Sequence, residues 1–235
     1  MAGKYLRGAL IVFTETFPSP VPRAIVFQYN PETMTHSWTP ATTNPGKADA
    51  PADPLAITGE PQESFSFTLA MDANDMIAGG DPVESALAEA SGVYTRLAAL
   101  EMLLFPTPPP LGQLIGAVTT ALLGIGSPSP DPTRQVPAAS LPMVLFVWGP
   151  GRIVPVRVTS LTITEKLYSA ELLNPTHVEA QVALRVLTAT ELQQVHGPRG
   201  TVARTAYGYS QALRQTLARD NLANAAESII GMLPI

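Results

Sequence analysis

The chain has 235 residues, of which 46% are hydrophobic, so it is long enough for one large domain or two small ones with an ordinary apolar core. It contains no cysteine, which excludes disulfides, thiolate metal sites and cysteine nucleophiles and favours cytoplasmic synthesis. The formal charge is -5 and the basic residues are scattered along the chain, so no basic face for nucleic acid is expected.

The first part of the chain predicts three short strands. Ala9–Phe13 is an apolar run too short for the hydrophobic region of a signal peptide, and we interpret it as a strand. Arg23–Tyr29 and Met34–Trp38 are expected to be strands on either side of a turn at Asn30-Pro31. Alternation separates two faces of the third strand: large side chains at Met34, His36 and Trp38, and small hydroxyls at Thr33, Thr35 and Ser37.

Two further runs alternate strictly between apolar and polar residues, which predicts half-buried strands. The first is Ser64–Met71, with inward positions Phe65, Phe67, Leu69 and Met71. The second is Val178–Val186, with inward positions Val178, Ala180, Val182, Leu184 and Val186.

A helix and a long insertion separate those two strands. Asp81 can cap one amphipathic helix that begins at Pro82 and ends near Phe105. Residues 106–142 are rich in proline and are predicted to be an insertion loop. The apolar segment Leu111–Gly126 is too short to span a bilayer, so we expect a short helix packed on the domain or on a neighbouring subunit, without membrane insertion.

The remaining strand signals follow the insertion. Met143–Trp148 is continuously apolar, so both of its faces should be covered, and Gly149–Gly151 predicts a hairpin turn. In the next run the apolar parity changes near Thr159-Ser160, which indicates a β-bulge. About seven antiparallel strands result, and an open sheet and a closed barrel are both compatible with them.

The end of the chain predicts a helical tail over Arg204–Ile230, after a flexible break at His196–Gly200. We therefore divide the chain into a strand domain, residues 1–195, and a linker with a helical tail, residues 196–235. The apolar side chains of the tail need a partner surface, and we expect that surface to lie outside the strand domain. They include Leu213, Leu217, Ile229 and Ile230.

Motifs for catalysis or metal binding are missing from the sequence. Its three histidines form no H-E-x-x-H pair, and His36 is interpreted as a core or interface residue. The acidic stretch DANDMIAGGD lacks the glycine and glutamate of a calcium loop, and there is no G-x-S-x-G or P-loop. We predict no catalytic residue, cofactor or metal, and we interpret four acidic residues as a solvated rim: Glu63, Asp72, Asp75 and Glu84.

The order of these segments resembles the tube-type domain of contractile injection systems, the phage-tail-like particles. The resemblance covers about Leu10–Leu192 and depends on four features, each weak by itself. These are the FQYNP run, the alternating strand that ends at Asp72, the VLFVWG hairpin, and the Asn174-Pro175 turn before the last strand. Relatives that join the spike to the tube often end in a LysM-like module, and here only the helical tail follows.

The resemblance implies a mainly β (α+β) fold, with two packed antiparallel sheets forming a tail-tube-like β-barrel, one flanking helix and a C-terminal helical tail. It also implies a structural, non-enzymatic role: six copies form a ring in the baseplate that joins the spike protein to the inner tube protein and contacts other baseplate proteins. Assembly would occur in the cytoplasm, in a particle that is released or retained. The alternatives are the inner tube protomer, or a small-ligand-binding barrel or enzyme.

In such a ring, the hydroxyl face of the third strand would be a neutral polar lining. The expected subunit or partner contacts are Met34, His36, Trp38, Val144, Phe146, Trp148, Leu213, Leu217, Ile229 and Ile230.

Overall fold

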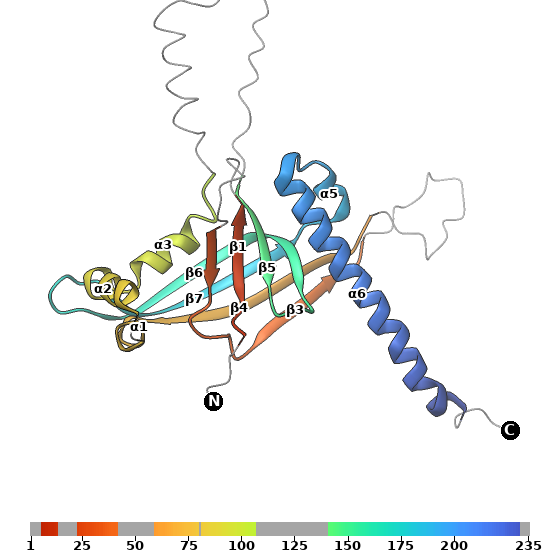
Figure 1. The fold of residues 1–235 in the computed structure, drawn as a ribbon, viewed down its shortest axis with the longest axis horizontal. Coiled ribbons are helices and arrows are strands. Elements are labelled where there is room, and N and C mark those ends of the chain that lie inside the picture. The colour runs from red at the N-terminus through yellow and green to blue at the C-terminus, as the bar shows by residue number, and fades with distance from the viewer. Residues whose placement is uncertain (1–5, 14–22, 42–58, 80, 107–140, 231–235) are drawn as a thin grey trace, which may run out of the picture.

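The computed structural model describes residues 6–13, 23–41, 59–79, 81–106 and 141–230, with side chains up to residue 221 (Figure 1). Its strands are β1 Ala9–Phe13, β2 Arg23–Val26, β3 Met34–Thr39, β4 Gln62–Asp72, β5 Met143–Val147, β6 Ile153–Tyr168 and β7 Pro175–Val186. Its helices are α1 Ala73–Ala78, α2 Pro82–Ser91, α3 Tyr94–Glu101, α5 Ala189–Gln193 and α6 Gly197–Ile230. The segment Leu111–Gly126 lies outside the described residues.

Within the described residues the strands form one antiparallel sheet of seven strands, in the order β2-β1-β5-β6-β7-β4-β3. The expected mainly β (α+β) fold is confirmed. The expectation of two separate sheets that close into a barrel is wrong, because one sheet runs from β2 to β3 and these two edge strands do not pair. The long strands β6 and β7 pair with each other along most of their length and belong to both halves of the sheet.

The sheet nevertheless folds over on itself. Phe146 of β5 packs against Phe65 and Phe67 of β4, with ring centroids 5.3 and 5.5 Å apart, although β6 and β7 lie between β5 and β4 in the sheet. The predicted bulge in β6 is confirmed at the register shift between Val158 and Ser160. Bulges increase local bending and twist. The two halves therefore face each other across one apolar core without closing a barrel.

The inward positions predicted on β4 and β7 are confirmed. All nine of these side chains are buried, and they join the main core with side chains from β1, β5 and β6. The residues between them on each strand are half-buried or exposed. One face of each strand thus belongs to the core and the other faces outward.

The continuously apolar strand β5 is covered on both faces, as predicted. Val144 and Phe146 face the main core, whereas Met143 and Leu145 belong to a second cluster with Leu192, Ala203 and Ala206 of α5 and α6. The first turns of α6 therefore pack on the sheet, which contradicts the expected docking outside the strand domain. The break predicted at His196–Gly200 is also wrong, because α6 begins at Gly197. The division of the chain at residue 195 remains a prediction.

The glycine and proline residues of the segment His196–Gly200, which suggested a break, lie in the first turn of α6 and are compatible with a helix. Proline is tolerated in the first helical turn, where its missing N–H has no helical acceptor. A Cβ on Gly200 would lie 1.9 Å from the carbonyl oxygen of Val195, so glycine is required for this close approach.

The helix expected from Pro82 to Phe105 is two helices, α2 and α3. Its predicted start is confirmed, because the Asp81 carboxylate accepts hydrogen bonds from the backbone N–H groups of Val83 and Glu84. The helix is interrupted at Gly92, which has a φ of 59° and lies so close to Pro175 that a Cβ would be 2.3 Å from its carbonyl oxygen. The next amide, that of Val93, donates to the same oxygen. The start of β7 therefore fixes the break between α2 and α3.

Helix α1 was not predicted from the turn-like sequence after β4. The Asp72 carboxylate caps it by accepting from the N–H of Asn74. None of the described helices is long and apolar enough to cross a membrane.

The junction from β7 to α5 is held by Glu191. Its carboxylate accepts two hydrogen bonds from Arg185 and one from the backbone N–H of Thr188, completing a capping box. Burial raises the pKa of Glu191, but these donors together lower it below its ordinary value. The ionised carboxylate therefore stabilises the folded state above the ordinary glutamate pKa of about 4.3, and this contribution is lost as the pH falls through the lowered value.

We predict that Glu191→Gln lowers the melting temperature at pH 7 and has a smaller effect at pH 3, because glutamine keeps the capping side chain but removes the charge. Thermal unfolding of both proteins across this pH range checks the expectation. Glu89→Gln, on the exposed face of α2, is the matched control. An unchanged difference between wild type and Glu191→Gln at every pH would contradict it.

Candidate assembly surfaces

The outward face of four neighbouring strands, β3, β4, β7 and β6, is rich in small hydroxyl side chains. In the register, Thr35 lies opposite Ser66, Ser66 lies opposite Ala183, and Ala183 lies opposite Ser160, so one row crosses all four strands. We call this surface the hydroxyl-rich face: Thr35, Ser37, Ser64, Ser66, Thr68, Ser160, Thr162 and Thr164. Two of the three lining residues expected on β3, Thr35 and Ser37, belong to it.

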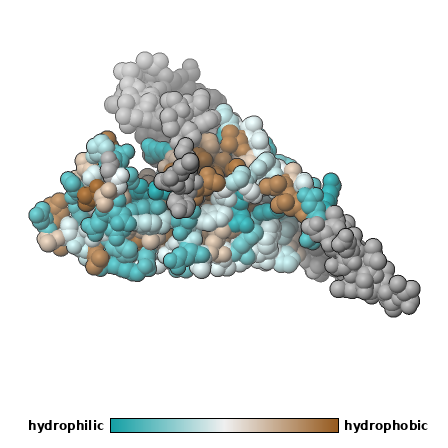
Figure 2. Space-filling model, turned by 60° about the horizontal axis from the view of Figure 1, so that its bottom comes forward, coloured by the Kyte–Doolittle hydropathy of each residue, from teal (hydrophilic) through white to brown (hydrophobic). Residues whose placement is uncertain are grey.

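Charged side chains lie mainly toward the two ends of the hydroxyl-rich face. Lys166 and Glu179 pair with each other at one end, and Arg157 and Arg185 lie at the other. Arg185 is already bound to Glu191. Figure 2 shows a broad area of hydrophilic and near-neutral residues, with hydrophobic residues gathered along its upper margin and at one end. The middle of the hydroxyl-rich face thus carries hydroxyl and amide side chains without a formal charge among the described residues.

The two edge strands are a second candidate surface. Within the described residues, β2 pairs with β1 and β3 pairs with β4, and neither has a strand on its other side. An edge of this kind presents unpaired N–H and C=O groups that can pair with another chain. On β3, Met34 packs against the main core while His36 and Trp38 lie on the same inner side near the end of the sheet.

The third surface is the junction between α6 and the start of β4, where Glu63 is buried. Its carboxylate accepts two hydrogen bonds from the Arg214 guanidinium of α6, and His36 lies 2.8 Å from one of its oxygens. The Glu63 side chain is only 3% exposed, so its placement in a solvated rim is wrong. The alternation of β4 gives the reason, since Glu63 has the same parity as Phe65 and Phe67 and therefore points inward.

Aromatic rings surround this ion pair. The Arg214 guanidinium lies 4.9 Å from the centre of the Trp38 ring, and His36 stacks on Phe65 with centroids 4.4 Å apart. A second guanidinium, that of Arg152, lies over the other aromatic residue of the cluster, Phe65, and burial lowers its pKa. The sequence did not indicate the roles of Arg152 and Arg214. For Arg214 the reason is that the pattern of α6 does not show which strand the helix crosses.

Further contacts fix α6 along the same line. Ser210 donates to the carbonyl oxygen of Ile153 at 2.7 Å, and Tyr209 donates to that of Pro150 at 2.9 Å. Helix α6 therefore lies across the β5–β6 hairpin and reaches β4, so it joins the two halves of the sheet at this end (Figure 1). Beyond Arg214 the helix extends away from the sheet.

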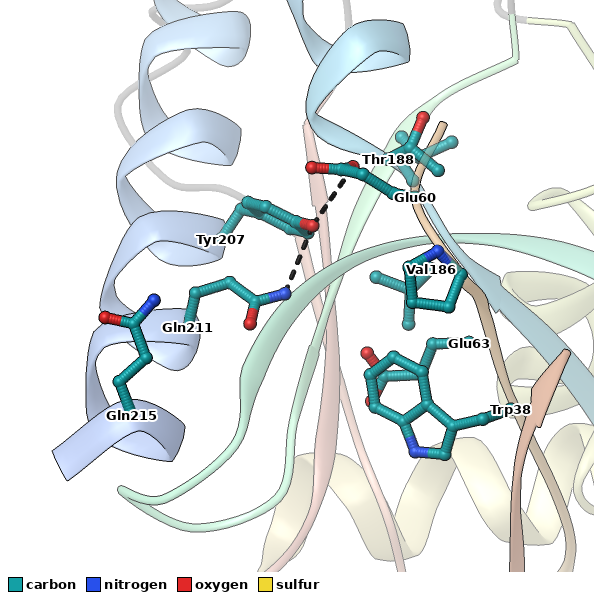
Figure 3. A pocket seen from close by; sticks show the side chains of 10 residues that line it. Trp38, Glu60, Glu63, Val186, Thr188, Tyr207, Gln211 and Gln215 are labelled. Carbon is teal, nitrogen blue, oxygen red and sulfur yellow. Dashed lines mark hydrogen bonds between the residues drawn. The ribbon is translucent and has the colours of Figure 1, made fainter. Parts of the chain in front are cut away.

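A groove of about 350 Å³ separates α6 from the ends of β4 and β7. Apolar side chains that line it include Trp38, Val186 and Leu187, and polar ones include Glu63, Thr188 and Gln215. At its rim Tyr207 donates to Glu60 and accepts from Gln211 (Figure 3). We call it the α6 groove. Polar side chains make up more of its lining than apolar ones.

The contact residues predicted from sequence therefore separate into three groups. Val144 and Phe146 are buried in the core of the chain itself, and Trp148 is half-buried against Phe27 and Phe146. The second group, nearer the surface, is Met34, His36 and Trp38 on β3, beside β4. The third group is on α6, where Leu213 is half-buried and Leu217 is 58% exposed. The side chains of Ile229 and Ile230 lie outside the described residues.

Acidic and histidine side chains within the described residues form no group of three that could hold a metal ion. His36 and His177 each contact one carboxylate, Glu63 and Asp72 respectively. These pairs connect neighbouring strands, β3 with β4 and β4 with β7, and they account for both side chains structurally.

We predict that Arg214→Met destabilises the fold by up to about 3 to 5 kcal/mol, because it leaves the buried Glu63 carboxylate without its main partner. The double variant Glu63→Met with Arg214→Met should recover much of this loss, since it removes both charges. Denaturant titration of the two single variants and the double variant measures the coupling. Arg219→Met, further along α6, is the control, and an Arg214→Met protein as stable as this control would contradict the role of the ion pair.

Comparison with known proteins assigns this chain to no family. No protein-family model matches the chain, and no curated protein matches it. Among solved structures, a chain from the tail of an empty gene transfer agent particle with C6 symmetry is 11% identical. That alignment covers 77% of this chain and 92% of the other, with a TM-score of 0.29.

Proposed function

We propose that this protein is a non-enzymatic structural component of a contractile injection system, in which six copies form a ring in the baseplate between the spike and the inner tube. The observation that carries the proposal is the arrangement of the sheet. Strands β4 and β7 bury aromatic and aliphatic side chains on one face, and on the other face β3, β4 and β6 present small hydroxyls. Within the described residues the sheet ends in two antiparallel edges that have no further partner strand.

The edges supply a way to build the ring. Because β2 and β3 are different strands, pairing the β2 edge of one copy with the β3 edge of the next is a head-to-tail contact, which closes into a ring when the rotation permits. The strands would then run from one rim of the ring to the other. Each copy could place its hydroxyl-rich face toward the lumen.

The chemistry of the hydroxyl-rich face suits such a lining. Small hydroxyl groups hold a layer of water, and a nearly neutral surface exerts little long-range attraction on a charged cargo. A wall of this kind would let polypeptides of either sign pass without tight binding. Cytoplasmic assembly of the particle belongs to the same proposal.

Helix α6 supports the baseplate position over the simpler alternative of an inner tube protomer. Its first turns cover β5 and its middle is fixed by the Glu63–Arg214 pair, whereas the segment after Arg214 extends beyond the sheet with Leu217 exposed. A helix that projects from the body can bind a different protein of the baseplate. An inner tube layer, which contacts only identical layers, would not need such a helix to bind a different protein.

Electron microscopy of the assembled particle tests the ring. We expect the density of this chain to follow six-fold symmetry between the spike and the first tube layer. Another symmetry, or the absence of the chain from the particle, would overturn the proposal. A chain that stays monomeric and binds a small molecule in native mass spectrometry would favour the ligand-binding alternative.

A truncation separates the two parts of α6. A chain that ends after Thr216 retains Ser210 and Arg214, so its melting temperature should stay close to that of the full chain. We expect it to form rings but to fail to enter particles, because the projecting segment is missing. Normal incorporation of the truncated chain would show that the segment has no recruiting role, and unfolding would show that it belongs to the core.

A further inference from the structure

Two arginine side chains lie in one aromatic cluster at the end of the sheet that α6 covers. The guanidinium of Arg214, on α6, lies over the Trp38 ring. The guanidinium of Arg152, in the turn between β5 and β6, lies 5.1 Å from the centre of the Phe65 ring. The His36 ring contacts both aromatic rings, with centroids 5.4 Å from Trp38 and 4.4 Å from Phe65. We call Arg152 and Arg214 the guanidinium pair.

A single carboxylate faces this pair. Within the described residues, Glu63 is the only acid in hydrogen-bonding contact with the cluster: both of its oxygens accept from Arg214, and one lies 2.8 Å from His36. The Arg152 side chain, by contrast, donates no hydrogen bond and forms no ion pair with any described residue. A guanidinium has several N–H donors and no acceptor, so the donors of Arg152 are available to a ligand.

The charge of Arg152 is therefore only partly balanced. The residue is half-buried, and burial lowers its pKa. Attraction to Glu63 raises that pKa and repulsion from Arg214 lowers it, so that the net change is downward. Arginine nevertheless stays charged at neutral pH. A half-buried guanidinium without a hydrogen-bonded partner costs desolvation energy, which a second carboxylate would offset.

The backbone holds Arg152 in a fixed place beside α6. Its carbonyl oxygen accepts from the Trp148 N–H at 2.8 Å, which closes the hairpin. The next residue, Ile153, is bound to Ser210 of α6, which donates to its carbonyl oxygen at 2.7 Å and accepts from its N–H at 3.3 Å. Both members of the guanidinium pair therefore project from elements that are tied to each other. A site that is fixed before its ligand arrives loses little conformational entropy on binding.

The guanidinium pair can be reached from outside. The side chains of Arg214 and His36 are 31% and 27% exposed, and Trp38 is 45% exposed. These residues lie where β3 forms an edge of the sheet and where α6 begins to extend away from it (Figure 1). A ligand that reaches them is therefore close to the projecting segment of α6.

We propose that the guanidinium pair binds the carboxylate of an aspartate or glutamate side chain from a partner protein that docks beside the projecting segment of α6. The carboxylate would accept hydrogen bonds from Arg152 and from the donors of Arg214 that Glu63 does not use, with Trp38 as an apolar wall. Arginine suits this ligand, because its planar donors match the two oxygens of a carboxylate. One carboxylate also supplies the negative charge that balances two arginines and one glutamate.

An acidic protein surface fits the site better than a nucleic acid does. Nucleic acid binding needs basic residues clustered along one face, and the other basic residues of this chain are scattered. The immediate neighbours of the guanidinium pair are instead the rings of Trp38, His36 and Phe65. That the partner is a baseplate protein rests on the proposed function, whereas the carboxylate site itself does not.

Arginine side-chain NMR spectroscopy with sodium acetate tests the site, because acetate carries the carboxylate of the proposed ligand without its polypeptide. We expect the Nε–H signals of Arg152 and Arg214 to shift in a saturable way as acetate is added. Acetamide and sodium chloride at matched concentrations should leave both signals unchanged. Signals that do not respond to acetate, or that respond equally to chloride, overturn the proposal.

The variant Arg152→Met separates a binding role from a structural one. Methionine keeps an apolar contact with Phe65 and removes the partly balanced cation, so the melting temperature should be equal or higher. We expect the acetate affinity, measured on the Arg214 signal, to fall at least about tenfold, since one of two charged donor groups is lost. Arg157→Met, which changes an exposed arginine on β6, is the control. A lower melting temperature with unchanged acetate affinity would assign Arg152 a structural role and overturn the proposal.

Particle assembly then identifies the source of the carboxylate. Rings of Arg152→Met that form normally but fail to enter particles, beside Arg157→Met rings that enter them, support a partner in the baseplate. Rings of Arg152→Met that enter particles as wild type does overturn that partner and leave the ring intact. An Arg152→Met protein that cannot form rings would place the carboxylate on a second copy and overturn a separate partner. A wild-type protein that binds acetate through Arg152 but never forms rings overturns the proposed function and leaves the site.

Discussion

The packing of Phe146 against Phe65 and Phe67 is the contact on which the rest of the structure depends. These rings come from strands separated by two others in the sheet, so they can meet only if the sheet folds over. That requirement explains the bulge in β6 and the length of β6 and β7. The folding over also gives the same strands an apolar inner face and a polar outer face. Burying the aromatic side chains thus leaves the small hydroxyl residues as the surface that the protein presents.

A sheet that folds over without closing has an open end, and α6 covers it. The helix places alanines against β5, where a close approach is needed, and an arginine where it reaches β4. The buried Glu63 carboxylate costs desolvation energy, which the Arg214 guanidinium and His36 offset only in the correct helix position. We infer that the ion pair fixes the position of α6 more than it adds stability. The projecting end of the helix then has a fixed direction relative to the sheet.

Much of the strand structure could be predicted from the sequence, because alternation is a local signal. The run from Phe65 to Met71 and the Asp81 cap needed no knowledge of distant residues. The break at Gly92, between α2 and α3, could not be predicted without such knowledge, because the carbonyl oxygen of Pro175 sets its position. Whether seven strands close into a barrel depends on the spacing of β2 and β3 in three dimensions, and no pattern within either strand encodes it.

The candidate surfaces divide in the same way. Thr35 and Ser37 were found by parity, and extending the β4 alternation by one step would have found the inward position of Glu63. The partner of Glu63 could not be found, because the pattern of α6 says nothing about the strand it crosses. Val144 and Phe146 were assigned to a contact surface because a strand that is apolar on both faces indicates a cover. They face the main core instead, and the cover of the other face, at Met143 and Leu145, proved to be the chain's own helices.

The strand order has a consequence for synthesis on the ribosome. Strand β4 pairs with β7, more than a hundred residues later, and β1 pairs with β5, which also follows the proline-rich insertion. Contacts between such distant segments form slowly and only after the later segment has left the ribosome. An incomplete chain can form the β1–β2 and β3–β4 ladders but lacks the central strands that unite them. Nascent chains therefore cannot form a finished sheet with both edges, and translation itself delays the completion of the sheet until β7 has been made.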